Sequence, residues 1–440
     1  MGEKELPEGW IRVSFTDVFD INGGTQPPKS VFIDLPKEGY IRLLQIRDFG
    51  SKPVPTYIPN NGKLMTCEVD DILIARYGAS IGRIVTGMEG AYNVALAKVK
   101  IPIQIDKVFV KWLLKSTIFQ NPILSIQRTA QNGFNKEDLS NIKIPLPPLA
   151  EQNRIVEKLD EIFASIEIVK TKLDAIPQLL KNFRQAVLSH AVTGKLTEKW
   201  RAEKGLEEWR EEVVENLSKR VTVGFVGKMS DKYVNEGIPF LRSQNVREFR
   251  YSDKNLLYVS KEFNDEIEKS KLYPNDIVIV RSGYPGTTCV IPSFLKEANC
   301  SDILIITPKV EKLNSYFFSI FMNSEIGKKI VFQGKVGNAQ QHFNTKILKK
   351  VTLNLPSLVE QEKIAFHVES LFATVDAIEL KYKKLKERID SIPQAILAKA
   401  FRGELVPLNP NDEPASELLE RIKETQTLGK KITRLTQVVA

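Results

Sequence analysis

The sequence of 440 residues is poor in the residues that usually hold metals or form disulfides. It has three cysteines, Cys67, Cys289 and Cys300, which are widely separated and include no Cys-x-x-Cys pair. This excludes a disulfide scaffold and the usual cysteine zinc site. The opening "MGEKELPEGW" has no apolar signal region, and no apolar run approaches membrane-spanning length. We therefore expect a cytoplasmic protein with no metal site and no membrane segment.

The familiar catalytic motifs are also missing. The nearest approach to a phosphate-binding P-loop is "GFVGKM" (224–229), which is too short and has Met229 after its lysine. "NPIL" (121–124) lacks the second proline and the aromatic residue of an adenine methyltransferase motif. The acids Asp71 and Asp276 have no nuclease-like Glu-x-Lys or Asp-x-Lys strand after them. The three histidines, His190, His342 and His367, have no partners that recur, and a structural role is favoured for each. We predict no catalytic residue and no cofactor bound by this chain.

The composition is that of an ordinary globular protein. Apolar residues make up 42% and charged residues 27%, and the length is sufficient for two to four domains. The net charge is +9, of which +3 lies in residues 1–150 and +4 in residues 206–355. These two blocks would suit two nucleic-acid-binding modules, although excesses of this size are also common in proteins that bind no nucleic acid.

A tandem duplication dominates the sequence. "PLPPLAEQ" (145–152) returns as "NLPSLVEQ" (354–361), 209 residues later, and the match runs without a gap to "PQAILAKAFRGEL" (393–405). Further upstream, "YIRLLQIRDF" (40–49) matches "FLRSQNVREF" (240–249), and "DDILIARYG" (70–78) matches "NDIVIVRSG" (275–283). Trp10 and Trp209 open the two copies. The protein is thus two copies of about two hundred residues.

A heptad pattern follows each proline motif. Apolar residues recur in steps of four and three over about four heptads, which is a strong coiled-coil signal. Each helix could simply pack on its own domain. Because the two seams match, we favour antiparallel pairing of the two helices with each other. The predicted seam residues are Ile155, Leu159, Ile162, Ile166, Val169, Leu173 and Ile176 in the first helix, and Ile364, Val368, Leu371, Val375, Ile378, Tyr382 and Leu385 in the second.

The ends of the two helices can also be read from the sequence. Ser357 and Glu360 predict a capping box at the second start, and Pro148 predicts a different beginning for the first. Gly194 and Gly403 stand where the helices should stop. Proline within a helix removes a hydrogen bond, so Pro177 and Pro393 are expected to kink or break the two rods.

The blocks before the helices predict mixed α and β structure. "DILIAR" and "DIVIVR" are short β-branched runs that begin at Asp71 and Asp276. Each precedes a glycine loop, and helical stretches follow at 108–116 and 316–323. The fold class is therefore α+β, as a tandem pseudo-two-fold duplication of a mixed domain followed by a long helix. The predicted domains are 1–145, 146–205 with the first helix, 206–353, and 354–440 with the second helix and a C-terminal tail.

These motifs resemble the specificity subunit of type I restriction-modification systems. The resemblance rests on "PLPPLAEQNRIVEKLDEIF", "NLPSLVEQEKIAFHVESLF" and "RGELVP" (402–407), and it covers nearly the whole chain. It implies two target-recognition domains that each read half of a split double-stranded DNA sequence, on either side of a helical spacer. It also implies docking of two methyltransferase subunits and of restriction subunits, which would bring S-adenosylmethionine, ATP and Mg²⁺. "NLPSL" departs from the proline pair only in the cap of the second helix.

Basic and polar residues near the predicted strands and glycine loops are our candidates for DNA contact. The alternative for the arginines that end the two strands, Arg76 and Arg281, is a salt bridge to an acid such as Asp71 or Asp276. Two other functions stay open: a scaffold that joins two protein-binding domains, and a nuclease or methyltransferase in its own right. The candidates are Lys29, Arg42, Gln45, Arg47, Arg76, Tyr77 and Arg83 in the first copy, and Lys228, Lys232, Arg242, Gln244, Asn245, Arg247, Arg281 and Tyr284 in the second.

Overall fold

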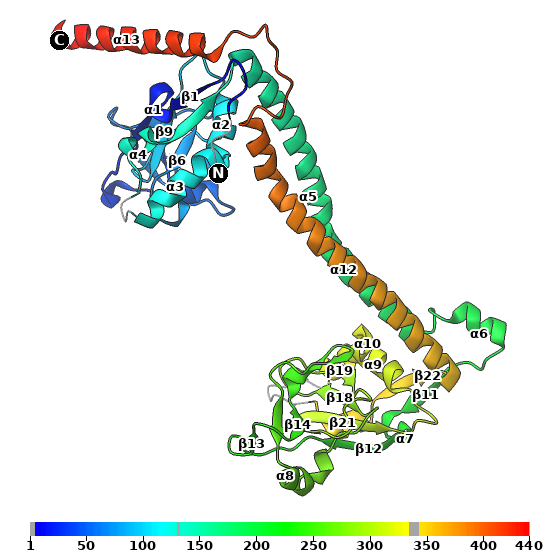
Figure 1. The fold of residues 1–440 in the computed structure, drawn as a ribbon. Helices are drawn as coiled ribbons and strands as arrows, with labels where there is room; N and C mark the ends of the chain where they lie inside the picture. The colour runs from blue at the N-terminus through cyan, green and yellow to red at the C-terminus, as the bar shows by residue number, and fades with distance from the viewer. Residues whose placement is uncertain (1–4, 130–132, 334–342, 440) are drawn as a thin grey trace. The chain divides into compact units, whose positions relative to one another are not determined.

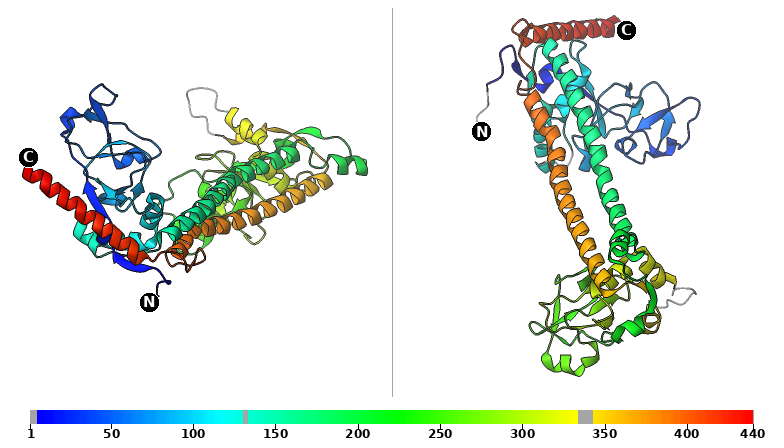
Figure 2. Two further views of the ribbon diagram at one scale, coloured as in Figure 1. Left: turned by 90° about the horizontal axis from the view of Figure 1, so that it is seen from above. Right: turned by 90° about the vertical axis from the view of Figure 1, so that its right-hand side faces the viewer.

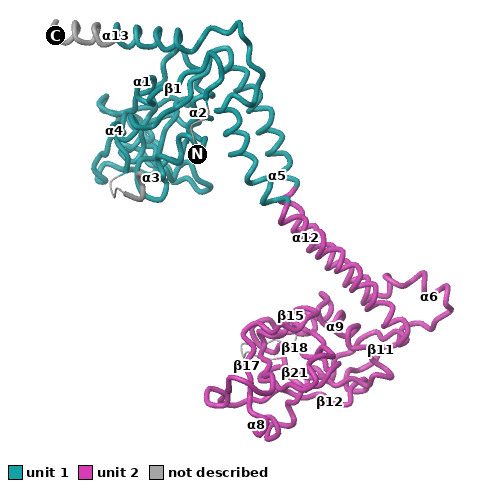
Figure 3. Tube along the Cα trace, viewed as in Figure 1, with its two compact units in different colours: residues 1–172, 385–440 teal, residues 173–384 magenta. Residues whose placement is uncertain are grey.

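The chain forms two compact units in a computed structural model that describes residues 5–129, 133–333 and 343–439 (Figure 3). Unit 1 comprises residues 1–172 and 385–440, and unit 2 comprises residues 173–384. His342, for which we expected a structural role, lies outside the described residues. The division of the chain into four domains stays a prediction.

A four-stranded antiparallel sheet forms the centre of each unit, with the same strand order in both (Figure 1). The two β-branched runs become β6 and β18, which are buried on both faces, as such runs predict. Unit 1 orders its strands β2 (Asp20–Gly23), β9 (Leu96–Lys100), β6 (Leu73–Ala75) and β7 (Ile84–Val85); unit 2 orders them β12 (Ser218–Val223), β21 (Ile303–Pro308), β18 (Ile277–Val280) and β19 (Thr288–Val290).

A second four-stranded sheet in each unit contains one parallel pair. That pair, β3 with β8 and β14 with β20, has the same register in both units, because Leu43 faces Ala91 where Phe240 faces Asn299. The strands are β4 (Tyr57–Pro59), β3 (Tyr40–Leu44), β8 (Gly90–Tyr92) and β5 (Thr66–Cys67) in unit 1, and β13 (Tyr233–Val234), β17 (Leu257–Val259), β14 (Ile238–Leu241) and β20 (Asn299–Cys300) in unit 2. A short ribbon of β15 (Val246–Arg247) and β16 (Arg250–Tyr251) is added in unit 2.

Short helices cover these sheets. The two stretches expected at 108–116 and 316–323 are confirmed as α2 (Lys107–Lys115) and α9 (Ser315–Asn323). Each begins at a side chain that accepts a backbone hydrogen bond, Asp106 in α2 and Asn314 in α9. The others are α1 (Phe15–Val18), α3 (Thr117–Thr129) and α4 (Lys136–Ser140) in unit 1, and α6 (Glu198–Lys204), α7 (Val214–Leu217), α8 (Lys261–Glu266), α10 (Glu325–Gln333) and α11 (Thr345–Lys349) in unit 2.

A two-stranded ribbon joins the beginning of each copy to its proline motif. In unit 1, β1 (Ile11–Ser14) pairs antiparallel with β10 (Lys143–Leu146). In unit 2, β11 (Arg210–Val213) pairs with β22 (Thr352–Leu355) in the same way. Each ribbon places the opening tryptophan of its copy beside the first turn of the long helix that follows.

The repeated Glu-Gln pair of the proline motif locks this junction. Trp10 Nε1 donates a hydrogen bond to Glu151 Oε2 at 2.8 Å, and Trp209 Nε1 donates to Glu360 Oε2 at 3.1 Å. The amide of Gln152 donates to the Pro147 carbonyl oxygen at 3.0 Å, and the second copy repeats this bond. All four acidic and amide side chains are buried. The motif therefore recurs because each unit needs the same buried junction.

The two long helices are α5 (Leu149–Val192) and α12 (Leu358–Ala400). Both start in the same way. The backbone N–H of Gln152 donates to the Pro148 carbonyl oxygen at 2.9 Å, and the backbone N–H of Gln361 donates to the Ser357 carbonyl oxygen at the same distance. The different beginning expected for the first helix is therefore not found. The predicted Ser357 capping box is also wrong, because the Glu360 carboxylate receives Trp209, Thr197 and Arg201 instead.

Neither proline within the long helices breaks them. Pro177 lies inside the 44-residue α5, and Pro393 lies inside the 43-residue α12. A proline removes one backbone hydrogen bond, and the many remaining bonds and the buried apolar face keep each helix continuous. The predicted ends are confirmed, since α5 and α12 stop shortly before Gly194 and Gly403, which adopt left-handed φ values of 78° and 70°.

Within each unit, segments of α5 and α12 run side by side and antiparallel (Figure 2). In unit 1, Lys170 forms an ion pair with Asp390 at 3.5 Å, and Ile155 shares a core with Leu397. In unit 2, Arg184 forms an ion pair with Asp376 at 2.5 Å. Together with the repeated mixed domains, this pairing confirms the predicted fold class.

The predicted seam is only partly buried. Ile155, Leu159, Ile166 and Leu173 are buried on α5, and Ile364, Val368 and Val375 are buried on α12. Val169, Ile378 and Leu385 are exposed. The remaining members, Ile162, Ile176, Leu371 and Tyr382, are half-buried. A two-helix contact covers a narrow stripe, and residues at its margin keep one side in solvent.

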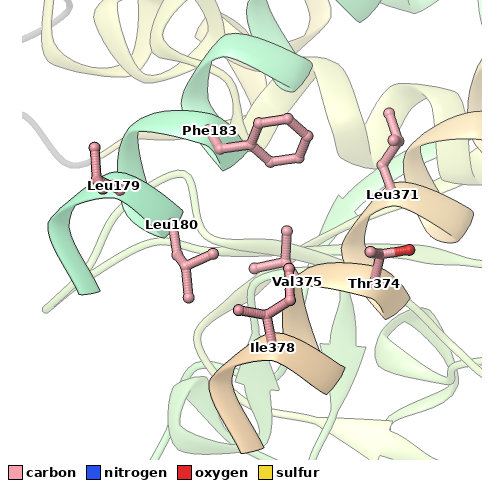
Figure 4. A pocket seen from close by; sticks show the side chains of 7 residues that line it. All are labelled: Leu179, Leu180, Phe183, Leu371, Thr374, Val375 and Ile378. Carbon is pink, nitrogen blue, oxygen red and sulfur yellow. The ribbon is translucent and has the colours of Figure 1, made fainter. Parts of the chain in front are cut away.

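An apolar hollow of about 310 Å³ opens between α5 and α12 in unit 2 (Figure 4). Its lining includes Leu179 and Phe183 on α5, both exposed, and Val375 on α12. The helix pair in unit 2 therefore leaves apolar surface uncovered. Among the described residues, no helix has the length and apolar character to cross a membrane.

The C-terminal segment returns to the start of unit 1. The Ala415 amide, at the beginning of α13 (Ala415–Val439), donates to the Gly9 carbonyl oxygen at 2.9 Å. Arg154 on α5 forms an ion pair with Asp412 at 2.6 Å. Ala415, Leu418 and Ile422 are buried in the core of unit 1. Unit 1 is therefore completed by residues from both ends of the chain.

Replacing Leu173 by Asp is expected to lower the free energy of unfolding by several kcal/mol. Leu173 is 5% exposed, so the substitution buries an unpaired charge. The neighbouring Lys172 is exposed, and Lys172→Asp should leave stability nearly unchanged. Denaturant unfolding of the two variants provides the comparison, and equal losses would contradict a buried seam at Leu173.

The two junction glutamates should respond differently to replacement by Gln. Burial raises the pKa of Glu151, and Trp10 is the one side chain among the described residues that donates a hydrogen bond to it. The ionised form is then disfavoured in the fold, so wild-type stability should rise as the pH falls from above this raised pKa towards the ordinary glutamate value. Glu151→Gln should remove that rise.

Glu360→Gln instead removes an ion pair with Arg201 at 3.0 Å and should cost about 3 kcal/mol at neutral pH. Unfolding curves of both variants measured at several pH values give the comparison. A larger loss of unfolding free energy at neutral pH for Glu151→Gln than for Glu360→Gln would contradict the expected difference between the two glutamates.

Candidate nucleic-acid interface

Arg76 and Arg281 occupy equivalent positions in the two units. Each directly follows the buried strand of its central sheet, β6 or β18, and precedes a glycine loop. The pairing registers agree, because Ala75 faces Leu96 where Val280 faces Ile303. The sequence match between these two segments is thus confirmed in three dimensions.

Among the described residues, the partners of the Arg76 guanidinium are neutral. Its Nε and Nη2 donate to the Phe134 carbonyl oxygen at 3.4 and 3.3 Å, and it lies over the Tyr77 ring at 5.1 Å. No described carboxylate forms an ion pair with it. Arg76 therefore keeps an uncompensated positive charge beside the loop that Gly78 opens.

Arg281 has an acidic partner instead. Its Nη1 donates to Asp302 Oδ1 at 3.0 Å, and Ser282 Oγ donates to the other carboxylate oxygen at 2.9 Å. Asp302 adopts a left-handed φ of 52°, just before β21 begins. This bond is of the kind that the salt-bridge alternative expected, but the acid is a different one.

The two acids named by that alternative bind other residues. Asp71 forms an ion pair with Lys98 at 3.0 Å. Asp276 is buried and accepts hydrogen bonds from Arg220 at 3.0 Å and Thr307 at 2.6 Å. Burial raises the pKa of Asp276, and the bonds from Thr307 and Arg220 counter this effect. Both acids are therefore structural, and neither neutralises Arg76 or Arg281.

A second group of candidates surrounds the short helix η2 (Ile46–Phe49) in unit 1. Gln45 and Arg47 donate to Thr56 Oγ1 at 3.4 and 3.2 Å. Arg42 lies 3.7 Å from Asp48 Oδ1. Arg83 Nη2 donates to the carbonyl oxygen of Phe49, at the end of η2. The structure thus brings four of the predicted residues, Arg42, Gln45, Arg47 and Arg83, to one short helix.

The corresponding group in unit 2 follows a different register from the one expected. The backbone N–H of Gln45 donates a hydrogen bond to Asp48 Oδ2, three residues ahead in the chain. The backbone N–H of Arg242 donates to Asn245 Oδ1 in the same way. With the strand registers of β3 and β14, this makes Gln45 equivalent to Arg242. The expected pairs Arg42 with Arg242 and Arg47 with Arg247 are therefore wrong by three residues. Loops of unequal length before β3 and β14 explain the slip.

Asn245 is a structural residue and not a candidate for DNA contact. It is fully buried, and its amide nitrogen donates to the carbonyl oxygens of Ser252 and Lys254 at 2.9 and 3.3 Å. Its oxygen receives the Arg242 amide. The prediction that it meets DNA is corrected accordingly. Its neighbours Arg242 and Gln244 both donate to the Asn255 carbonyl oxygen, at 3.0 and 3.2 Å.

The remaining candidates are separate from these groups. Lys29 is exposed in the short helix η1 (Lys29–Val31), and Lys228 and Arg247 are exposed in unit 2. Lys232 lies over the Phe263 ring at 5.2 Å. Tyr284 is 81% exposed in the glycine loop after Arg281. The structure leaves the DNA-binding role of all these residues a prediction.

Some residues that shape these groups had no clear sequence signal. Asp302 and Thr56 are single polar residues outside any motif, and their bonds depend on the folded loop. The junction bonds of Glu151 and Glu360 did have a signal, because tryptophan and Glu-Gln recur together in both copies. A pairing of those two repeated features could have been proposed from sequence.

Metal ligands and thiol nucleophiles are two kinds of group that the described residues can be searched for. These residues contain no group of three or more His, Cys, Asp or Glu that could hold a metal ion. All three cysteines are buried, and burial raises the pKa of Cys67 to about 11 and of Cys289 to about 12. Such thiols stay protonated near neutral pH and are poor nucleophiles.

Two segments of the chain, residues 7–178 and 220–387, match the family described as type I restriction modification DNA specificity domain. The chain belongs to this family. The match repeats once in each half, as the duplication does. Each matched segment contains both four-stranded sheets of one copy, apart from the first two residues of β12 in the second copy, and the first part of the long helix that follows.

Curated relatives extend over the whole chain. The type I restriction enzyme EcoKI specificity subunit of Escherichia coli (strain K12) is 30% identical over 471 residues, which cover 99% of each chain. The EcoBI specificity subunit of Escherichia coli is 28% identical over 473 residues, covering 98% of this chain and 96% of the relative.

Solved structures share the fold. A crystal structure of the HsdS subunit from Thermoanaerobacter tengcongensis has a TM-score of 0.62 at 18% identity, covering 92% of this chain and 99% of that one. A chain from a structure of a type I restriction-modification system, studied for complex assembly and conformational transition, has a TM-score of 0.63 at 17% identity and covers 92% of this chain and 100% of that one.

Proposed function

We propose that this chain is the DNA-recognition subunit of a type I restriction-modification complex and that it reads a bipartite double-stranded DNA site. The observation that carries the proposal is the double family match, which falls separately on each copy of the repeated domain. Two domains with the same strand order can each contact one half of a split sequence. A duplicated reader suits a two-part DNA target.

The proposal assigns the chemistry to other chains. The two copies share no catalytic constellation in the sequence, and the basic groups around Arg47 and Arg76 are suited to binding. We infer that two methyltransferase subunits bring S-adenosylmethionine and that restriction subunits bring ATP and Mg²⁺. The uncovered apolar side chains on α5 and α12, such as Leu179 and Phe183, supply surface for docking. The complex would act in the cytoplasm, where the DNA is.

The competing proposal is a scaffold that joins two protein-binding domains. It explains the paired helices equally well, but it gives no reason for an uncompensated arginine beside a glycine loop. DNA binding that weakens steeply with salt separates the two proposals.

The decisive experiment mixes the full chain with its methyltransferase partner and DNA. We expect weak binding by the chain alone, tighter and sequence-specific binding with the partner, and a complex of two methyltransferases to one chain. Exchanging residues 1–145 for the block of a relative should change one half of the recognised sequence and preserve the other. A chain that binds no DNA with or without its partner would overturn the proposal.

Replacement of Arg76 and of Arg281 by Ala should separate their roles. Arg76 has no acidic partner among the described residues, so Arg76→Ala should weaken binding to all sequences and lower the salt slope by about one. Arg281 is already neutralised by Asp302, so Arg281→Ala should change stability by about 1 kcal/mol or less and leave the salt slope unchanged. Salt titrations of DNA binding, with thermal unfolding of each variant, provide the measurement. A lowered salt slope for Arg281→Ala with an unchanged slope for Arg76→Ala would contradict this difference.

A further inference from the structure

The indole of Trp112 is held firmly where α2 meets α5 in unit 1. Its ring stacks on Phe163 with centroids 4.3 Å apart, and its Nε1 donates to Asp160 Oδ1 at 3.1 Å. The residue is 9% exposed. Trp112 therefore offers a rigid surface for the side chains around it.

Two lysine ammonium groups lie over this ring. Lys111 Nζ is 5.5 Å and Lys115 Nζ 5.2 Å from the ring centroid, and both lysines are half-buried. They are four residues apart on one helix, where like charges repel each other. No described carboxylate lies within 4 Å of either nitrogen. Burial, and then the charge of Lys111, lowers the pKa of Lys115.

Packing of the fold does not require this lysine pair. The equivalent helix in unit 2 is α9, which starts at the same kind of cap, Asn314 in place of Asp106. Its corresponding residues are Ser319 and Asn323, which are buried and bonded to the backbone of Thr288. The same helix position can thus hold neutral side chains with internal partners.

The helix that carries the pair adjoins one end of the candidate interface. The α2 helix packs against β7, the strand that begins directly after Arg83. The next helix, α3, supplies Gln120, which donates to the Gly82 carbonyl oxygen at 2.9 Å. Two basic groups without an acid therefore lie on a helix that adjoins the Arg83 end of that interface.

We propose that Lys111 and Lys115 together bind a backbone phosphate of the DNA held by unit 1. A phosphate would supply the missing counter-charge, and the ring and the neighbouring helix turn hold both ammonium groups ready for it. Lysine ammonium groups are point charges and read no base. The contact adds affinity without sequence preference, and it rests on the proposed function of the chain.

The test uses the full chain with its methyltransferase partner and the double variant Lys111→Gln/Lys115→Gln. Lys199→Gln/Lys204→Gln on α6 removes the same charge from exposed positions and serves as the control. Binding is measured against salt on a duplex with the recognised site and on one with the unit 1 half-site scrambled. The lysine pair variant should bind both duplexes more weakly by the same factor, with a salt slope lower by about one. Lys111→Arg/Lys115→Arg should restore the slope, and the control should match the wild type.

Three results would overturn the proposal. In the first, the folded Lys111→Gln/Lys115→Gln variant binds DNA as the wild type does, with an unchanged salt slope. This result would exclude the phosphate contact but would not affect the proposed function of the chain. Unchanged DNA binding with weakened binding of the methyltransferase would assign the pair to an acidic protein surface. A wild-type chain that binds neither duplex would remove the proposed function, and this inference with it. Thermal unfolding, and the single variants Lys111→Gln and Lys115→Gln, separate lost binding from lost folding.

Discussion

The hydrogen bond from the opening tryptophan of each copy to a buried glutamate is the constraint on which each unit depends. It connects the first strand of the unit to the first turn of its long helix, and the neighbouring glutamine holds the proline carbonyl that precedes the helix. The two copies support this bond unequally. Glu360 also accepts hydrogen bonds from Thr197 and Arg201. In the described part of the chain Glu151 accepts a side-chain hydrogen bond from Trp10 only, and burial raises its pKa. The same junction is thus electrostatically satisfied in unit 2 and more costly in unit 1.

Much of the fold could be predicted because its causes are local or repeated. The heptad seams, the buried β-branched runs and the helices at α2 and α9 depend on periodicities within a short window. The copy-to-copy match extended these assignments across the chain. The bonds of the junction join residues 141 and 151 positions apart, which no local pattern reveals. The continuity through Pro177 was also missed, because it depends on the packing of the whole helix and not on the residue itself.

The candidate interface was harder to predict because a charge acts according to its neighbours. Arg76 and Arg281 are indistinguishable in the repeat, but one faces a carbonyl oxygen and the other a carboxylate. The partner of Arg281 is Asp302, which has a left-handed φ and lies just before β21. No sequence pattern marks this position. Asn245 was chosen for its residue type and is buried. The pairs Arg42 with Arg242 and Arg47 with Arg247 were misaligned by three residues. The loops before β3 and β14 differ in length, whereas the core strands keep the same register.

The return of the C-terminal segment to unit 1 has a consequence for biosynthesis. Residues 173–384 form unit 2 without an interruption, whereas unit 1 needs residues 385–440 as well as the first 172. Its core includes Leu397, Phe401, Leu418 and Ile422, which leave the ribosome only after the whole of unit 2. Domains generally fold as units during synthesis, from the N-terminal side onward. Here the domain that is synthesised first obtains its full core only after the second one is complete. A chain that terminates soon after residue 384 therefore has a whole unit 2 and an unfinished unit 1.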